Sequence, residues 1–167
     1  MRRALVLSGL VVLAIGLGAG ATPVSATTLG KVVIADAMVT AAPANGESAV
    51  ILTITNDRSG PISLTAVSSP VSGTSMLYFD KNMCKGNHAM RWLGNILIQP
   101  GRVQSLALKQ QGVMLSSLHS AVIKGSFVHL VVNWSDFQTA HSVSIRAKVI
   151  APPKGLHFHF TAMNMNM

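Results

Sequence analysis

Short segments in which every second residue is apolar stand out in the carboxyl-terminal part of this chain. Two of them keep the pattern over four apolar residues each, namely Val128, Leu130, Val132 and Trp134, and Val143, Ile145, Ala147 and Val149. Because successive side chains of a β-strand point to opposite faces, a period of two predicts strands with one buried and one solvated face. We therefore predict strands over residues 127–134 and 141–149.

The chain between residues 49 and 108 is organised in the same way. Short apolar or β-branched runs alternate with clusters of Gly, Pro, Asn, Asp and Ser, which favour turns. The predicted strands are residues 49–55, 62–67, 75–79, 96–98 and 103–108, and the turn clusters are residues 56–61, 68–73 and 99–102. Helical periodicity is weak, and a single helical turn is expected at residues 114–118. Many short strands at close spacing predict an all-β sandwich or barrel.

The amino-terminal residues have the organisation of a secretory signal peptide. Arg2 and Arg3 give a positive start, residues 4–21 are almost wholly apolar, and Val24-Ser25-Ala26 is a small-x-small cleavage site. We expect residues 1–26 to be removed by cleavage near Ala26, and the mature protein to reach a bacterial periplasm without a membrane span. The apolar run also approaches the length of a spanning helix, so an uncleaved anchor is the alternative.

Pro152 and Pro153 mark the end of the predicted folded domain. Proline lacks the N–H donor that a strand needs to continue its ladder. The sequence therefore predicts one domain over residues 27–150, followed by a flexible tail over residues 151–167. The tail holds five candidate metal ligands, namely His157, His159, Met163, Met165 and Met167.

The distribution of charged residues argues against several classes of function. Thirteen Lys and Arg residues outnumber five Asp and Glu residues, but they are spread singly, whereas a nucleic-acid binder gathers them in a stripe with interleaved aromatic residues. We see no paired carboxylates, nucleophile motif or Gly-rich phosphate loop in the sequence. We therefore expect neither nucleic-acid binding nor catalysis. The single cysteine, Cys84, cannot form a disulfide within the chain.

Soft metal ligands gather in the tail and in a second region around residues 83–90, which contains Cys84, His88 and Met90. Thioether, thiolate and imidazole groups suit copper, whereas Mg²⁺, Ca²⁺ and Mn²⁺ prefer oxygen. We therefore predict copper binding, with Cu(I) preferred and Cu(II) as a second ion for the His-containing tail. Met76 is expected to fill the core of its strand. The isolated His119, His129 and His141 are expected to be solvated or satisfied by neighbours.

Six segments of the mature chain match a known pattern. They are residues 32–37, 49–56, 68–73, 90–91, 98–101 and 112–115, the last of which reads Gly112-Val113-Met114-Leu115. In these segments the chain resembles the periplasmic copper chaperones of the PCuAC family. The resemblance implies a cupredoxin-like β-barrel that carries Cu(I) on two His and two Met. It also implies a copper-accepting partner, such as a cytochrome oxidase subunit or another copper chaperone.

Only half of that family's metal ligands are present at the matching positions. Met90 and Met114 fall on the two methionines, with the family's spacing of 21 residues between Met90 and Gly112. Tyr78 and Gly112 stand where the two histidines are expected. A protonated phenol is a poor Cu(I) ligand and glycine has no side chain. The nitrogen or thiolate ligands of a working site would then come from elsewhere in the chain.

The resulting hypothesis is that Met90 and Met114 hold Cu(I) together with ligands from the neighbouring loop and the tail, namely Cys84 or His88 and His157 or His159. Two other classes of protein stay open. A degenerate family member that acts as an assembly or structural partner, with the tail as its only copper binder, is consistent with the loss of both histidines. An electron-transfer cupredoxin needs two His, a Cys and usually a Met, and the absence of any His before His88 weighs against it.

Overall fold

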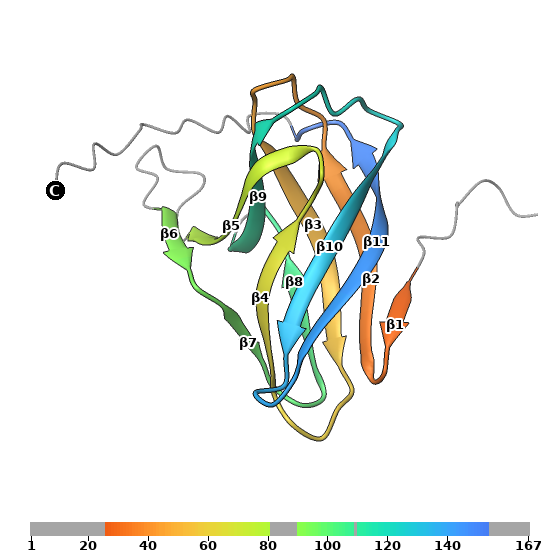
Figure 1. Ribbon diagram of the computed structural model, residues 1–167, viewed down its shortest axis with the longest axis vertical. Helices are drawn as coiled ribbons and strands as arrows, with labels where there is room; N and C mark the ends of the chain where they lie inside the picture. Colours follow the sequence, from red (N-terminus) through yellow and green to blue (C-terminus); the bar gives the residue numbers. More distant parts are fainter. Residues whose placement is uncertain (1–25, 81–89, 109, 154–167) are drawn as a thin grey trace, which may run out of the picture.

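The computed structural model describes residues 26–80, 90–108 and 110–153, and these residues form a strongly curved β-sheet (Figure 1). All regular secondary structure within these residues is β-strand, so the predicted all-β class is confirmed. The strands are β1 (Thr27–Leu29), β2 (Val32–Thr40), β3 (Ser48–Asn56), β4 (Ile62–Ser68), β5 (Ser72–Asp80), β6 (Met90–Leu93), β7 (Ile96–Ile98), β8 (Arg102–Leu106), β9 (Gln111–Leu118), β10 (Phe127–Ser135) and β11 (Ala140–Ile150).

The strands belong to one sheet that folds over on itself. Their order is β6-β5-β9-β3-β2-β11-β10-β4-β7, with β1 paired to β2 and β8 paired to β3. Among the described strands, β11 and β2 pair in parallel, and the other pairs are antiparallel. β4 and β5 are far apart in this order but lie next to each other in space (Figure 1). The sheet is therefore a nearly closed barrel.

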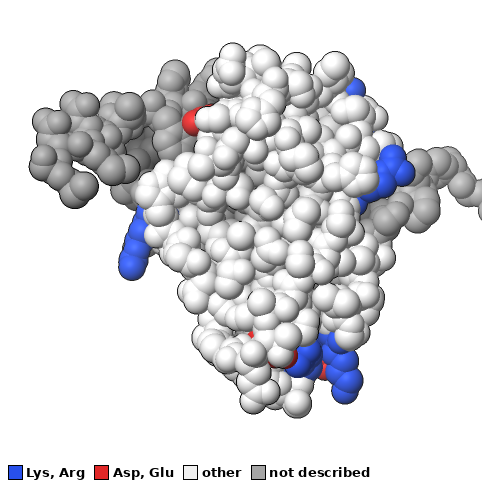
Figure 2. All heavy atoms as spheres, viewed as in Figure 1, with Lys and Arg blue, Asp and Glu red and all other residues white. Residues whose placement is uncertain are grey.

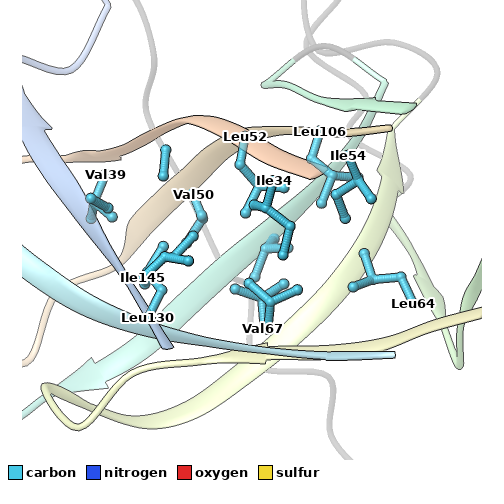
Figure 3. Close-up of a cluster of buried hydrophobic side chains, with 14 of the residues drawn as sticks. Ile34, Val39, Val50, Leu52, Ile54, Leu64, Val67, Leu106, Leu130 and Ile145 are labelled. Carbon is cyan, nitrogen blue, oxygen red and sulfur yellow. The ribbon is translucent and has the colours of Figure 1, made fainter. Parts of the chain in front are cut away.

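The core lies between the two walls of this barrel. Figure 3 shows the side chains of β2, β3 and β8 pointing toward those of β4, β10 and β11. The labelled residues of the first wall are Ile34, Val39, Val50, Leu52, Ile54 and Leu106, and those of the second are Leu64, Val67, Leu130 and Ile145. All ten are buried. Burial of such side chains is the main stabilising term for a domain with no internal disulfide.

The hairpin of β10 and β11 confirms the alternation seen in the sequence. Its cross-strand partners include Leu130 with Ile145 and Val132 with Val143, and Leu130, Val132 and Ile145 all belong to the core cluster. His129, one residue along from Leu130, is exposed. The side-chain period of two thus places one face of the hairpin in the core and the other in solvent.

The turn predicted at residues 99–102 is present and is of type II. The Arg102 N–H donates to the Gln99 carbonyl at 3.2 Å, Pro100 occupies the second position, and Gly101 has a φ of 67°. A type II turn needs a positive φ at its third position, which glycine adopts without strain. The turn directs the chain from β7, which pairs with β4, to β8, which pairs with β3.

The helical turn expected at residues 114–118 is wrong, because these residues belong to β9. Gly112, Val113, Met114 and Leu115 are all buried, so both faces of this part of β9 are covered. A strand that is buried on both faces loses its apolar–polar alternation. The continuous apolar run could not be distinguished from a buried helical turn by its period.

Candidate metal centre

Three neighbouring strands bring together the four positions that the PCuAC resemblance singles out. In the register between β5 and β9, Tyr78 lies directly opposite Gly112. Met114 follows two residues later on β9, and Met90 lies opposite Asp80 at the start of β6. Positions separated by up to 36 residues in the sequence thus meet at one corner of the barrel, at the left of Figure 1.

The site lies on the side of β5 and β9 that faces away from the main core. Leu77, Val113 and Leu115 belong to the core cluster, so Tyr78 and Met114, which alternate with them, point to the other side. Tyr78 and Met114 are nevertheless fully buried, with 0% of their surface exposed. We call this side of β5 and β9 the thioether face, and it comprises Met76, Tyr78, Gly112 and Met114.

Tyr78 and Gly112 fit each other closely. An added Cβ at Gly112 would lie 2.6 Å from both Cζ and Oη of Tyr78, a distance at which something must shift. The φ of Gly112 is not in the left-handed region, so glycine is needed here for space and not for its backbone conformation. The tyrosine ring fills the space that a side chain at position 112 would take. The two departures from the family's histidines are therefore coupled through one contact.

The hydroxyl group of Tyr78 is buried and has no hydrogen-bond partner among the described residues. Burial, followed by the charge of Asp80, raises the pKa of Tyr78 from 10.0 to about 12. The phenol is therefore neutral at any physiological pH, because burial disfavours the phenolate. Tyr78 forms a neutral aromatic wall of the thioether face and cannot serve there as an anionic ligand.

Met76 is a candidate ligand that sequence reasoning missed. It was expected to fill the core, but it is only partly buried and lies outside the core cluster. In the register between β5 and β9 it stands directly opposite Met114. Its position two residues before Tyr78 in an alternating strand was the available signal, because residues i and i+2 share a face.

Most of the other predicted ligands lie outside the described residues. These are Cys84, His88, His157, His159, Met163, Met165 and Met167, and for Met90 only the backbone register is described. Of the predicted ligands, Met114 alone has a described side chain. Within the described residues no group of three or more His, Cys, Asp or Glu side chains is placed to hold a metal ion. The soft donors that the described residues place on the thioether face are the sulfur atoms of Met76 and Met114.

A second polar cluster lies at the end of the barrel formed by the turns after β3 and β10, at the bottom of Figure 1. Arg58 donates to Asp136 Oδ2 at 2.6 Å, and His141 Nε2 lies 3.3 Å from the same oxygen. The His141 ring stacks on Trp134, with the ring centroids 4.0 Å apart. We call these four residues the Asp136 cluster. His141 is thus satisfied by its neighbours, while His119 and His129 are exposed.

Asp136 is held as a carboxylate by several donors. Its Oδ1 accepts hydrogen bonds from the backbone N–H groups of Thr139 at 2.8 Å and Gln138 at 3.2 Å. The Thr139 N–H is the largest cause of a pKa lowered from 3.8 to about 2, and His141, Gln138 and Arg58 act in the same direction against burial. A carboxylate with every oxygen engaged in this way closes a turn, and we assign the Asp136 cluster a structural role.

The basic side chains do not form a stripe on the face shown in Figure 2, where Lys and Arg stand apart at its margins. In addition, no described residue belongs to a helix with the length and apolar character needed to span a membrane.

The fold and the strand register define a PCuAC-type, cupredoxin-like β-barrel. Three solved structures share this architecture. They are the copper-bound PCuAC domain from PmoF2 (TM-score 0.61, 18% identity, covering 77% of this chain and 99% of that one), the apo PCuAC domain from PmoF1 (0.62, 21%, 77% and 100%), and CuI-DR1885 from Deinococcus radiodurans (0.57, 24%, 72% and 78%). At these identities the likeness establishes the fold, as the sequence resemblance implied.

The sequence itself places the chain in a family. Residues 32–149, well over half of the chain, match the family model described as “Putative lipoprotein LpqE-like”. The chain therefore belongs to the LpqE-like family. That description suggests an exported protein. None of the curated proteins matches the chain in sequence.

Proposed function

We propose that this protein is an exported copper carrier of the bacterial periplasm that binds Cu(I) and passes it to a copper-accepting protein. The observation that carries the proposal is the position of Met114. It is a buried thioether on the face of the barrel where the PCuAC resemblance puts the metal. Two of the proteins that share the fold are described as copper-bound or as a Cu(I) form.

The donor chemistry supports Cu(I) over other ions. Thioethers are soft ligands that select Cu(I), whereas carboxylate and carbonyl oxygens select Mg²⁺, Ca²⁺ or Mn²⁺. Thioethers also carry no proton at physiological pH, so binding at Met does not compete with protonation as it does at His or Cys. Ligation by neutral sulfur is suited to a carrier, because the ion leaves by ligand exchange. We propose Met90 and Met114 as ligands in the barrel, with Cys84 or His88 nearby in the sequence.

The tail provides the second part of the proposal. His157, His159, Met163, Met165 and Met167 supply imidazole and thioether ligands within eleven residues. We propose that they add ligands that the barrel lacks at positions 78 and 112. The acceptor would be a copper centre of the kind found in a cytochrome oxidase subunit, or another copper chaperone.

A second candidate function is favoured by the contact between Tyr78 and Gly112. Because the tyrosine ring fills the space of a side chain at position 112, the barrel is also suited to a role as an assembly or structural partner. In that case the tail would be the only copper binder. The two candidates differ in which part of the chain holds the metal.

A Cu(I) titration against a competing chromogenic chelator separates these candidates. The full chain is compared with the double variant Met90→Leu/Met114→Leu, with a deletion of residues 155–167, and with Met38→Leu. Met38 is a matched control, because it is another partly buried strand methionine that lies opposite Ile51, away from the thioether face. The carrier proposal expects weaker binding in the double variant and unchanged binding in Met38→Leu.

Unchanged affinity in the double variant, together with loss of binding on tail deletion, would assign copper to the tail alone. A full chain that does not compete with the chelator at all would overturn the proposed function. Intense visible absorption on adding Cu(II) would instead indicate an electron-transfer cupredoxin, because a blue-copper site requires Cu(II) bound by a cysteine thiolate.

A further inference from the structure

Met76 and Met114 form a direct cross-strand pair on the thioether face. Directly opposed residues of an antiparallel pair point to the same side and have Cβ atoms about 4.5–5.5 Å apart. Met76 and Met114 occupy such a position in the register between β5 and β9. Methionine side chains have three rotatable bonds, so two thioethers at this separation can approach a single ion.

The two methionines differ in their access to solvent. Met114 is fully buried, whereas Met76 is only partly buried. Met76 also lines a cavity of about 160 Å³ between β4, β5 and β6, together with Leu77 and Trp92. Met114 is thus closed to water, while Met76 borders a hollow.

The Tyr78 ring limits which ligands can join this pair. It occupies the space above Gly112, so an imidazole cannot be presented from position 112 without displacing the ring. Its own hydroxyl has no hydrogen-bond partner in the described part of the chain. The soft donors that the described residues offer at this corner are therefore the thioethers of Met76 and Met114. The aromatic ring of Trp92 lies opposite Tyr78 on β6, and the buried carboxylate of Asp80 follows Tyr78 by two residues on β5.

We propose that Met76 is a metal ligand that takes one of the two coordination places left by the missing histidines, so that the barrel site is built on the Met76–Met114 thioether pair and the tail adds to it. This inference rests on the proposed function. It names the substrate class as soft monovalent cations, Cu(I) and Ag(I). We expect the thioether pair to bind these ions more tightly than Zn(II) or Cu(II), which favour imidazole or anionic ligands.

Methyl NMR of the full chain with ¹³C-labelled methionine tests the assignment directly. Ag(I) is the probe, because it is a soft monovalent ion that does not change oxidation state on binding. The ε-methyl signals of Met76 and Met114 are expected to shift together as Ag(I) is added, and the signal of Met38 is expected to stay in place. Zn(II) at the same concentration is expected to move neither Met76 nor Met114.

The matched variants Met76→Leu and Met38→Leu give the corresponding affinities. Leucine conserves the volume of methionine, so both variants are expected to fold, and their thermal unfolding checks this. Met76→Leu is expected to weaken Ag(I) and Cu(I) binding at the barrel by at least about tenfold. Losing a residue that only supports a metal ligand already lowers metal affinity by about that factor, and losing a ligand should lower it at least as much. Met38→Leu is expected to leave it unchanged.

The outcomes separate this inference from the proposed function. If Met114→Leu weakens binding while Met76→Leu does not, Met76 is no ligand and the carrier proposal stands. If neither substitution weakens binding and neither methyl signal moves, the barrel site itself is refuted. A Zn(II)-induced shift equal to that of Ag(I) would overturn the assigned substrate class.

Discussion

The thioether face and the Asp136 cluster each contain a buried aromatic residue, Tyr78 and Trp134. They differ in the groups beside that residue and in how far those groups are hydrogen-bonded. In the Asp136 cluster the carboxylate accepts from Arg58, from His141 and from two backbone N–H groups. On the thioether face, Tyr78 has a buried hydroxyl without a hydrogen-bond partner among the described residues, and the groups beside it are the thioethers of Met76 and Met114 and the buried carboxylate of Asp80. The comparison teaches that a carboxylate whose oxygens all accept hydrogen bonds stabilises a turn, whereas thioethers, which carry no charge or proton, remain available for a soft ligand.

The largest expected effect tests the fit between Tyr78 and Gly112. Gly112→Ala is expected to lower the free energy of unfolding by about 1–3 kcal/mol, because overpacking forces neighbours to move. Urea unfolding measures the change, and Gly94→Ala is the control, since an added Cβ at Gly94 meets nothing within 4 Å. In a double-mutant cycle, Gly112→Ala should lower the free energy of unfolding much less when Tyr78→Leu is already present. An equally large loss of unfolding free energy in the Tyr78→Leu protein would show that the Tyr78 ring is not what an added Cβ at Gly112 meets.

The second prediction concerns the titration of Tyr78, which is the chain's single tyrosine. Ultraviolet absorbance of tyrosinate should report a pKa of about 12 in the folded protein, against an ordinary value of 10.0. Because the folded state favours the protonated phenol, this contribution to stability is complete below pH 10 and is lost as the pH rises toward 12. Tyr78→Phe should remove that part of the alkaline loss of stability. A tyrosinate transition near pH 10 in the folded protein would contradict the buried, unpartnered hydroxyl.

The third prediction tests the Asp136 cluster at acid pH. The pKa of Asp136 is lowered from 3.8 to about 2, so the folded state favours the carboxylate. Its contribution to stability is present above about pH 4 and is lost as the pH falls toward 2. Asp136→Asn should therefore flatten the decline of the unfolding midpoint across this interval. Asp57→Asn, which changes an exposed carboxylate on the turn after β3, is the control and should leave the decline as it is.

The smallest expected effect is on copper itself. Asp136→Asn is expected to leave the Cu(I) affinity unchanged, because an isolated carboxylate oxygen is a poor ligand for a soft ion and the cluster lies away from β6 and β9. The chelator competition used for the methionine variants measures it. If Asp136→Asn lowered the Cu(I) affinity as much as Met114→Leu does, the assignment of copper binding to the thioether face and of a structural role to the Asp136 cluster would be wrong.

Part of the fold was predictable from the order of residues alone. The strands at residues 127–134 and 141–149 and the turn at residues 99–102 were found because alternation and turn residues are local signals. β2 (Val32–Thr40) was not identified as a strand, and its register with β3 shifts between Ala35 and Met38. At that shift Asp36 has a φ of 55°. Such an irregularity, typical of a β-bulge, interrupts the period of two that a sequence search relies on.

The sequence by itself determined the all-β class, the absence of an internal disulfide and the presence of soft ligands, because composition and periodicity are properties of the chain. It also located positions 78, 90, 112 and 114 through the family resemblance. Only the tertiary structure decided that Tyr78 lies on Gly112 and that Met76 stands opposite Met114. These contacts depend on the register between two strands more than 30 residues apart, and register is set by packing across the whole sheet.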